Sequence, residues 1–170
     1  RYESSAASDV YKRQIFTFIS PEADALGSGW NIAQSKIAIG SGQFFGKGYM
    51  EGSQSQLDFI PESHTDFIFA VIVEEFGFLG ALILFFLYSF LIYKLLLVAK
   101  KSNSKFAKLV AATLSIILAA YITLNISMVV GIFPVVGMPL PFISQGGTAL
   151  VVNMITIGII LSLRRTTWKK

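Results

Sequence analysis

Long apolar runs separated by short polar links dominate the second half of the chain. The first run, Phe76–Val98, has 23 residues and a single charge, Lys94, near its end. The second, Leu109–Phe133, stops at the helix breaker Pro134, and the third, Gly146–Leu163, has 18 residues. A helix of 23 residues is about 34 Å long, which is enough to cross roughly 30 Å of hydrocarbon. The pattern therefore predicts three transmembrane helices, and the lack of period-2 alternation disfavours a β-barrel.

The distribution of charge supports an integral membrane protein. The chain has 170 residues, of which 54% are apolar and only 14% are charged, and it has no Cys. No Lys, Arg, Asp, Glu or His occurs in the 55 residues from Leu109 to Leu163, whereas a soluble helix must show a polar face to water. A soluble domain and a disulfide-stapled secreted domain are excluded. The net charge of +4 is a topology signal and not a nucleic-acid footprint.

Two basic clusters predict the orientation of these helices. One cluster lies between the first two spans and the other follows the third, so alternating helices place both on one side, which the positive-inside rule makes cytoplasmic. We therefore expect transmembrane helices over residues 67–98, 109–133 and 146–163, a cytoplasmic loop over 99–108, an extracytoplasmic re-entrant loop over 134–145 and a cytoplasmic tail over 164–170. The clusters are Lys100, Lys101, Lys105 and Lys108, and Arg164, Arg165, Lys169 and Lys170.

The first 66 residues are more polar. Residues 1–14 lack apolar periodicity and the apolar stretch of a signal peptide, so we expect a non-native or disordered segment there. Residues 15–66 are expected to contain the end of a preceding helix and a large extracytoplasmic loop, because the stretch is polar and Gly-rich with interleaved aromatic residues. Trp30, Ala33 and Ile37 share one helical stripe, which predicts a short interfacial helix.

The sharpest candidate chemistry lies just before the first span. Asp66 ends the run from Pro61 to Asp66, where a carboxylate near the membrane surface can have a raised pKa and act as a general base. The alternative is an ordinary helix start with a capping acid. Glu74 lies two i, i+4 steps beyond Asp66, which predicts that both share one helical face. Acids so close to an apolar span are either functional or paired at the interface.

Two Gly-rich segments differ in what they predict. Gly40–Gly48 superficially resembles a phosphate cradle but fails both the dinucleotide and the Walker patterns, so a tight loop is the favoured interpretation, although Lys47 could still meet an anionic headgroup. The uncharged segment Gly131–Gly147, broken by three Pro and four Gly, predicts a re-entrant loop that lines a site. One His and no Cys give no metal-ligand spacing, so no protein metal site is expected.

Several motifs occur together in this chain, namely Gly27–Gly42, Gln54–Pro61, His64–Ala70, Glu74-Glu75 and Pro139–Ser144. Together they resemble the SEDS family (shape, elongation, division and sporulation). Lys36, Gly46-Lys47-Gly48 and Pro134–Gly137 resemble the RodA branch more than the FtsW branch. The resemblance implies an all-α integral membrane fold of about ten helices, of which this chain has the last three and the large extracytoplasmic loop. Gln145 departs from the pattern, since Tyr usually follows the Ile-Ser pair.

The resemblance implies a multi-pass bacterial inner-membrane glycosyltransferase that polymerises peptidoglycan from lipid II, and a fragment that is inactive alone. Implied partners are a class B penicillin-binding protein transpeptidase, other cell-wall elongation proteins and membrane lipids, with no nucleic acid. The family's catalytic acid falls on Asp66. We expect no bound cofactor, apart from a divalent cation such as Mg or Mn on the lipid diphosphate. The candidate substrate-binding residues are Lys47, Lys36, His64, Thr65, Glu62, Glu74 and Ser144.

Two other functions fit the same pattern. Pro- and Gly-broken helices with buried acids also suit a lipid II flippase or another membrane transporter. A non-catalytic scaffold of the cell-wall synthesis complex is the third interpretation. Polymer formation distinguishes the enzyme from both alternatives.

Overall fold

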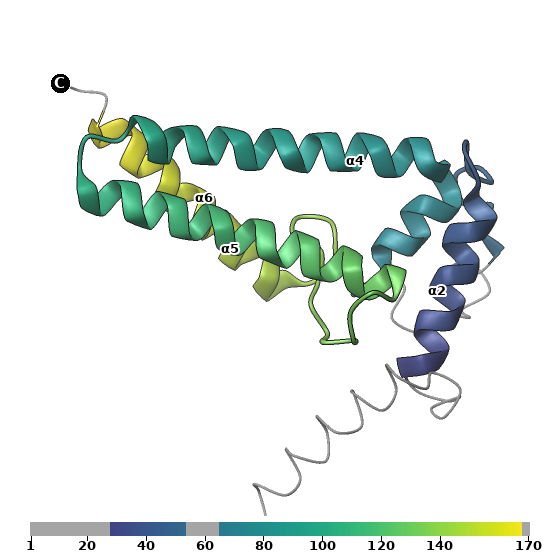
Figure 1. Ribbon diagram of the computed structural model, residues 1–170. Coiled ribbons are helices and arrows are strands. Elements are labelled where there is room, and N and C mark those ends of the chain that lie inside the picture. Colours follow the sequence, from purple (N-terminus) through teal and green to yellow (C-terminus); the bar gives the residue numbers. More distant parts are fainter. Residues whose placement is uncertain (1–27, 54–64, 168–170) are drawn as a thin grey trace, which may run out of the picture.

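Four helices make up most of the computed structural model, which describes residues 28–53 and 65–167. They are α2 (Ser28–Gly42), α4 (Ile68–Lys101), α5 (Lys105–Val130) and α6 (Gly147–Thr167) (Figure 1). Every regular element in the described ranges is helical. The last three helices are long and apolar enough to cross a membrane, so the three predicted spans are present.

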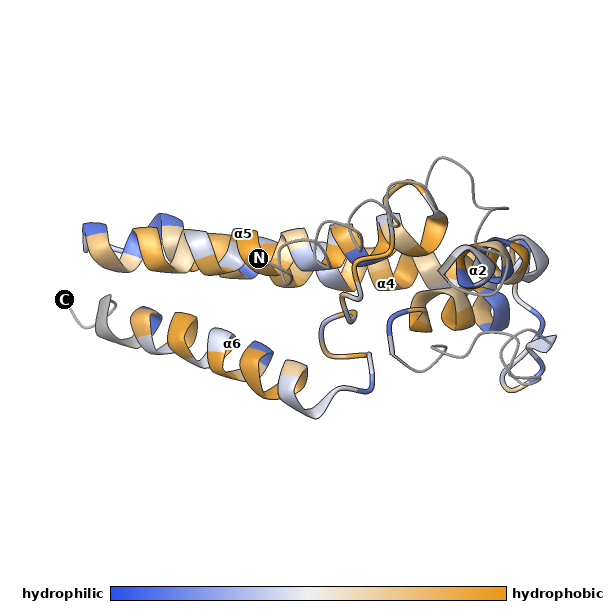
Figure 2. Cartoon of the chain, turned by 90° about the horizontal axis from the view of Figure 1, so that it is seen from below, coloured by the Kyte–Doolittle hydropathy of each residue, from blue (hydrophilic) through white to orange (hydrophobic). Residues whose placement is uncertain are grey.

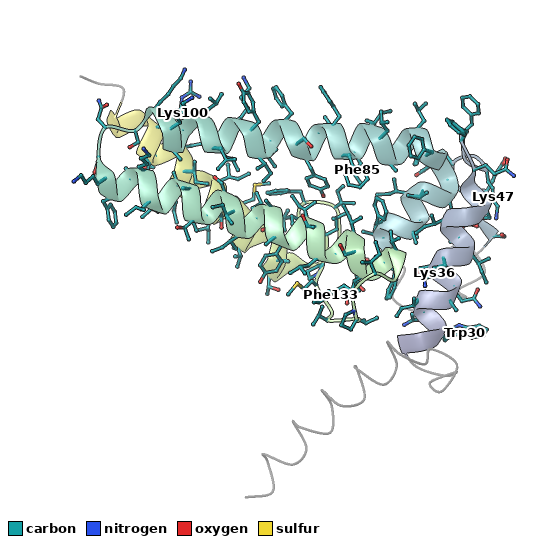
Figure 3. The ribbon with its side chains drawn as sticks, in the orientation of Figure 1. Trp30, Lys36, Lys47, Phe85, Lys100 and Phe133 are labelled. Atoms are coloured by element: carbon teal, nitrogen blue, oxygen red, sulfur yellow. The ribbon has the colours of Figure 1, made fainter. Side chains whose placement is uncertain are left out.

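The three long helices alternate in direction, and their basic ends lie together at one end of the bundle. α4 and α5 lie side by side, joined by a short basic link, and α6 returns toward the same end (Figure 1). Lys94 and Lys101 of α4 and Arg164 of α6 line one pocket, so both basic clusters reach the same end of the bundle. Apolar residues dominate the helices between their ends (Figure 2). Lys47 and Lys100 lie at opposite ends of the molecule (Figure 3).

The helix bounds differ from the expected spans mainly in the basic link. α4 continues to Lys101 and α5 begins at Lys105, because hydropathy marks the lipid-crossing part of a helix and not its polar continuation. α5 ends three residues earlier than expected, at Val130. The next residue, Gly131, adopts a left-handed φ of 79° and donates its N–H to the Met128 carbonyl, which is a common way for helices to end.

α4 is broken near its start. Gly77 has φ 68° and ψ −164°, a region that is nearly restricted to glycine. Phe69 and Phe85 each lie eight residues from Gly77, or about 12 Å along a helix, yet their ring centroids are 6.1 Å apart. The two arms therefore bend sharply toward each other, as Figure 1 shows.

α2 crosses the ends of α4 and α5 at the end opposite the basic link (Figure 1). Ser35 is fully buried and donates from Oγ to the Val129 carbonyl at 2.8 Å, which satisfies one of the carbonyls that the end of α5 leaves without a helical partner. The predicted helix is present, but its stripe of Trp30, Ala33 and Ile37 is exposed, and the buried face includes Ile32 and Ser35.

Candidate functional site

Asp66 lies in a turn just before α4, which begins at Ile68. The expectation that Asp66 and Glu74 share a helical face is therefore wrong, because the chain at Asp66 is not yet helical. The N-cap position is taken by Phe67, which is 1% exposed. Burial of this Phe67 ring anchors the turn, while the Asp66 side chain remains partly accessible.

The backbone of Asp66 is held by α5. Asn125, which is fully buried, donates from Nδ2 to the Asp66 carbonyl at 2.9 Å and to the Met138 carbonyl at 2.5 Å. One amide group thus joins α5, the re-entrant loop and the turn before α4. Asn125 is not among the site residues predicted from the sequence, although an amide in a run of 55 residues without charge is a signal, since buried polar groups are hydrogen-bonded.

Ser144 fixes the neighbouring residue. Its Oγ donates to the Thr65 carbonyl at 2.6 Å and accepts from the Leu140 N–H at 2.6 Å. A hydroxyl has one donor, so the hydrogen of Ser144 is committed to the chain next to Asp66. The structure therefore gives Ser144 a positioning contact. Gln145, where the family pattern has Tyr, is exposed.

Replacing Ser144 with Ala should destabilise the complete protein by about 1–3 kcal/mol, because the Leu140 N–H and the Thr65 carbonyl lose their partner. Thermal unfolding in detergent measures the change. Thr123→Val is the matched control, since Thr123 is exposed and bonds only within its own helix, to the Ala119 carbonyl. Equal stability of the two variants would show that the Ser144 contact is dispensable.

The loop between α5 and α6 folds back among the helices. Its Pro141 carbonyl accepts a 2.6 Å hydrogen bond from the buried Tyr88 hydroxyl of α4. Tyr88 lies eleven residues past Gly77, or about 16 Å along the helix, so the loop returns well along the span. This placement agrees with the predicted re-entrant loop.

A cavity of about 640 Å³ lies between α5, α6 and this loop. Its walls combine apolar groups with polar ones, among them Tyr121, Asn153 and Thr156. Gly137 also lines it, and a Cβ on Gly137 would stand 3.5 Å from Asp66 Oδ2. The Asp66 carboxylate therefore lies beside Gly137, a residue of the cavity wall.

The Gly-rich loop after α2 fills the break in α4. In an unbroken helix, the N–H groups of residues 78 and 79 would bond to the carbonyls of residues 74 and 75. At the break, loop residues 43–48 supply partners to all four groups. The bonds are Phe78 N–H to Gln43 O (2.9 Å), Leu79 N–H to Phe44 O (3.2 Å), Lys47 N–H to Glu74 O (3.0 Å) and Gly48 N–H to Glu75 O (3.1 Å).

Two glycines permit this close approach. A Cβ on Gly46 would stand 2.0 Å from the Glu75 carbonyl oxygen, and one on Gly77 would stand 2.3 Å from the Gly46 nitrogen. The N–H groups of Lys47 and Gly48 bond to the broken helix, so they do not form a phosphate cradle. The structure agrees with a tight loop for this segment.

Lys47 and Glu74 form an ion pair at the break in α4. Lys47 Nζ lies 2.8 Å from Glu74 Oε1, and the Glu74 side chain is fully buried whereas that of Lys47 is 28% exposed. Ser53 Oγ accepts from Lys47 Nζ at 2.7 Å and lies 3.3 Å from Glu74 Oε1. Glu74 is therefore the buried partner of a lysine from the loop, and part of the Lys47 side chain remains open to solvent.

The remaining candidate residues are dispersed. Lys36 is exposed on α2, and a Cβ on Gly131 would stand 2.7 Å from its Nζ, so its ammonium lies at the C-terminal end of α5, where positive charge is favourable. Glu62 and His64 lie outside the described residues, as do residues 1–27. Within the described ranges, no three His, Cys, Asp or Glu side chains gather as metal ligands.

Comparison with known proteins identifies the family. The model of the family that unites FtsW, RodA and SpoVE, described as cell cycle proteins, matches residues 4–169. The chain belongs to this family. The peptidoglycan glycosyltransferase MrdB of Escherichia coli K12 is 50% identical over 155 residues, which are 91% of this chain and 42% of MrdB. The peptidoglycan glycosyltransferase RodA of Treponema pallidum is 39% identical over 88% of this chain and 35% of that RodA.

Solved structures support the same fold. A peptidoglycan synthase complex described as coordinating polymerization and crosslinking has a TM-score of 0.76 and 24% identity over 93% of this chain and 42% of the solved chain. An aspartate-to-alanine mutant of the Thermus thermophilus rod shape determining protein RodA has a TM-score of 0.60 and 29% identity over 64% of this chain and 37% of that one. The chain spans about two fifths of the length of these relatives.

Proposed function

We propose that the complete protein containing this chain polymerises lipid II into glycan strands, with Asp66 as the general base. The observation that carries the proposal is the fixed position of Asp66. Its backbone carbonyl is held by Asn125 of α5 and its carboxylate lies beside the cavity wall at Gly137. The family and the names of the relatives supply the reaction type.

Glycosyl transfer from lipid II needs few catalytic groups. The acceptor hydroxyl attacks the anomeric carbon of the donor sugar as the bond to the lipid diphosphate breaks. The Asp66 carboxylate takes the hydroxyl proton, and the diphosphate leaves with the bonding electron pair. Positioning, a base and neutralisation of the leaving charge therefore account for most of the catalysis.

The other candidate residues have supporting roles in this proposal. Thr65, held by Ser144, and His64 orient the segment around Asp66. Lys47 contacts the diphosphate through its ammonium group, which also pairs with the buried Glu74. Lys36 contacts the diphosphate or the sugar-peptide groups, and Glu62 is a further candidate substrate-binding residue. A divalent cation bound to the diphosphate supplies further positive charge.

The setting follows from the same proposal. The basic end of the helix bundle faces the cytoplasm of a bacterial inner membrane, by the positive-inside rule, so the C-terminus is cytoplasmic and Asp66 faces outward. The motifs shared with the RodA branch favour cell elongation and rod-shape maintenance, with a class B penicillin-binding protein as the crosslinking partner.

Purified complete protein together with its class B partner, given labelled lipid II in vesicles, tests the activity. We expect glycan polymer on gel electrophoresis, even when the transpeptidase of the partner is inactivated. Movement of labelled lipid II across the bilayer without polymer would support a flippase instead. Complex formation with neither polymer nor transport would support a scaffold.

A further inference from the structure

A pocket of about 310 Å³ opens between the basic ends of α4 and α6. Three cationic side chains line it, Lys94 and Lys101 from α4 and Arg164 from α6. The rest of the described lining is aliphatic and comes from both helices, with Leu97 and Leu161 among its members. The pocket thus presents positive charge and apolar surface to the same ligand, which is the complement of an amphiphilic anion.

Among the residues that the structure describes, no Asp or Glu side chain lies near this end. All ten Asp and Glu residues lie at or before Glu75, and the 95 residues from Phe76 to Lys170 contain nine Lys or Arg. The described acids lie at or near the opposite end of the bundle, around the break in α4 and the turn before it. The last 95 residues therefore carry an excess of basic over acidic side chains, which favours an anionic ligand at this end of the bundle.

The pocket also extends along the axis of α4. Lys94 and Lys101 are seven residues apart on one face of α4, or about 10 Å along its axis. The Lys94 ammonium lies 5.0 Å from the centroid of the Phe90 ring, beside the apolar surface of the helix. A ligand that reaches both lysines must therefore carry its negative charge at the edge of the hydrocarbon layer, as a phospholipid does.

We propose that this pocket binds the headgroup phosphate of an anionic phospholipid, with its acyl chains along the aliphatic walls of α4 and α6. Basic pockets between transmembrane helices are known to take such headgroups. The site lies at the end of the bundle opposite Asp66 and needs no assumption about glycosyl transfer.

Lipid binding to the complete protein in neutral detergent tests the proposal. Native mass spectrometry measures the affinity for phosphatidylglycerol, cardiolipin and phosphatidylcholine. The variant K94Q/K101Q/R164Q removes the three pocket cations. The matched control K100Q/K105Q/K108Q removes three exposed cations at the same end that do not line the pocket.

We expect the pocket variant to lose at least about tenfold in affinity for the two anionic lipids, since each Lys or Arg near an anionic surface contributes several-fold. The control should lose much less, and phosphatidylcholine should bind weakly to all forms. Equal losses in the two variants would show general charge attraction and overturn the site. An unchanged pocket variant would show that other parts of the protein neutralise the cations. Displacement of the lipid by inorganic phosphate alone would exclude a ligand held through its acyl chains.

Discussion

Asp66→Asn in the complete protein should lower the rate of glycan polymerisation by about 10²- to 10⁴-fold, the usual contribution of a general base. The substitution keeps the shape of the side chain and removes its ability to accept a proton. Two contacts that hold this segment go to the carbonyls of Thr65 and Asp66, and the substitution keeps both of them. Folding and partner binding should therefore be retained. Single-turnover polymerisation of labelled lipid II, with the melting temperature measured in parallel, gives the result.

Glu51→Gln is the control for loss of a carboxylate. Glu51 is exposed in the loop that packs against the break in α4, at the same end of the molecule as Asp66, and has no role in the proposed site. We expect its polymerisation rate to match that of the unmodified protein. A normal rate for Asp66→Asn, at unchanged stability, would remove Asp66 from the role of base.

The features set by local pattern could be predicted from the sequence. The three spans follow from apolar runs such as Leu109–Phe133, and the alternation of the basic ends follows from the placement of Lys and Arg. The re-entrant loop follows from Pro and Gly in an uncharged segment, because such backbone must be buried in protein. The short helix that contains Trp30 is present as predicted. Its position at the membrane interface, with the exposed stripe of Trp30, Ala33 and Ile37 toward the headgroups, stays a prediction.

Features set by distant contacts could not be predicted. Lys47 and Glu74 are 27 residues apart, and Ser144 meets Thr65 across 79 residues, so no local period links them. The break at Gly77 depends on the φ of one residue, to which mean hydropathy over a window is insensitive. Asp66 was placed on a helical face for the same reason, since periodicity does not mark where the helix begins.

Lys47→Met should destabilise the complete protein by about 3–5 kcal/mol, because it leaves the fully buried Glu74 carboxylate without its cation. Glu74 lies three residues before Gly77, and its own carbonyl accepts a hydrogen bond from the Lys47 N–H. The loss of stability is therefore expected at the break in α4, where the loop after α2 holds the first arm of the helix. Urea or thermal unfolding of the complete protein in detergent measures the change.

The double variant Lys47→Met with Glu74→Gln distinguishes the effect of the Glu74 charge from the effect of the other contacts at the break in α4. It removes the uncompensated charge, keeps the amide within reach of Ser53 and leaves the four backbone bonds of the break in place, so it should recover most of the lost stability. Lys105→Met, at an exposed lysine in the opposite basic link, should change stability by about 0.5 kcal/mol or less. If the double variant is as unstable as Lys47→Met alone, the lost stability does not come from an uncompensated charge on Glu74.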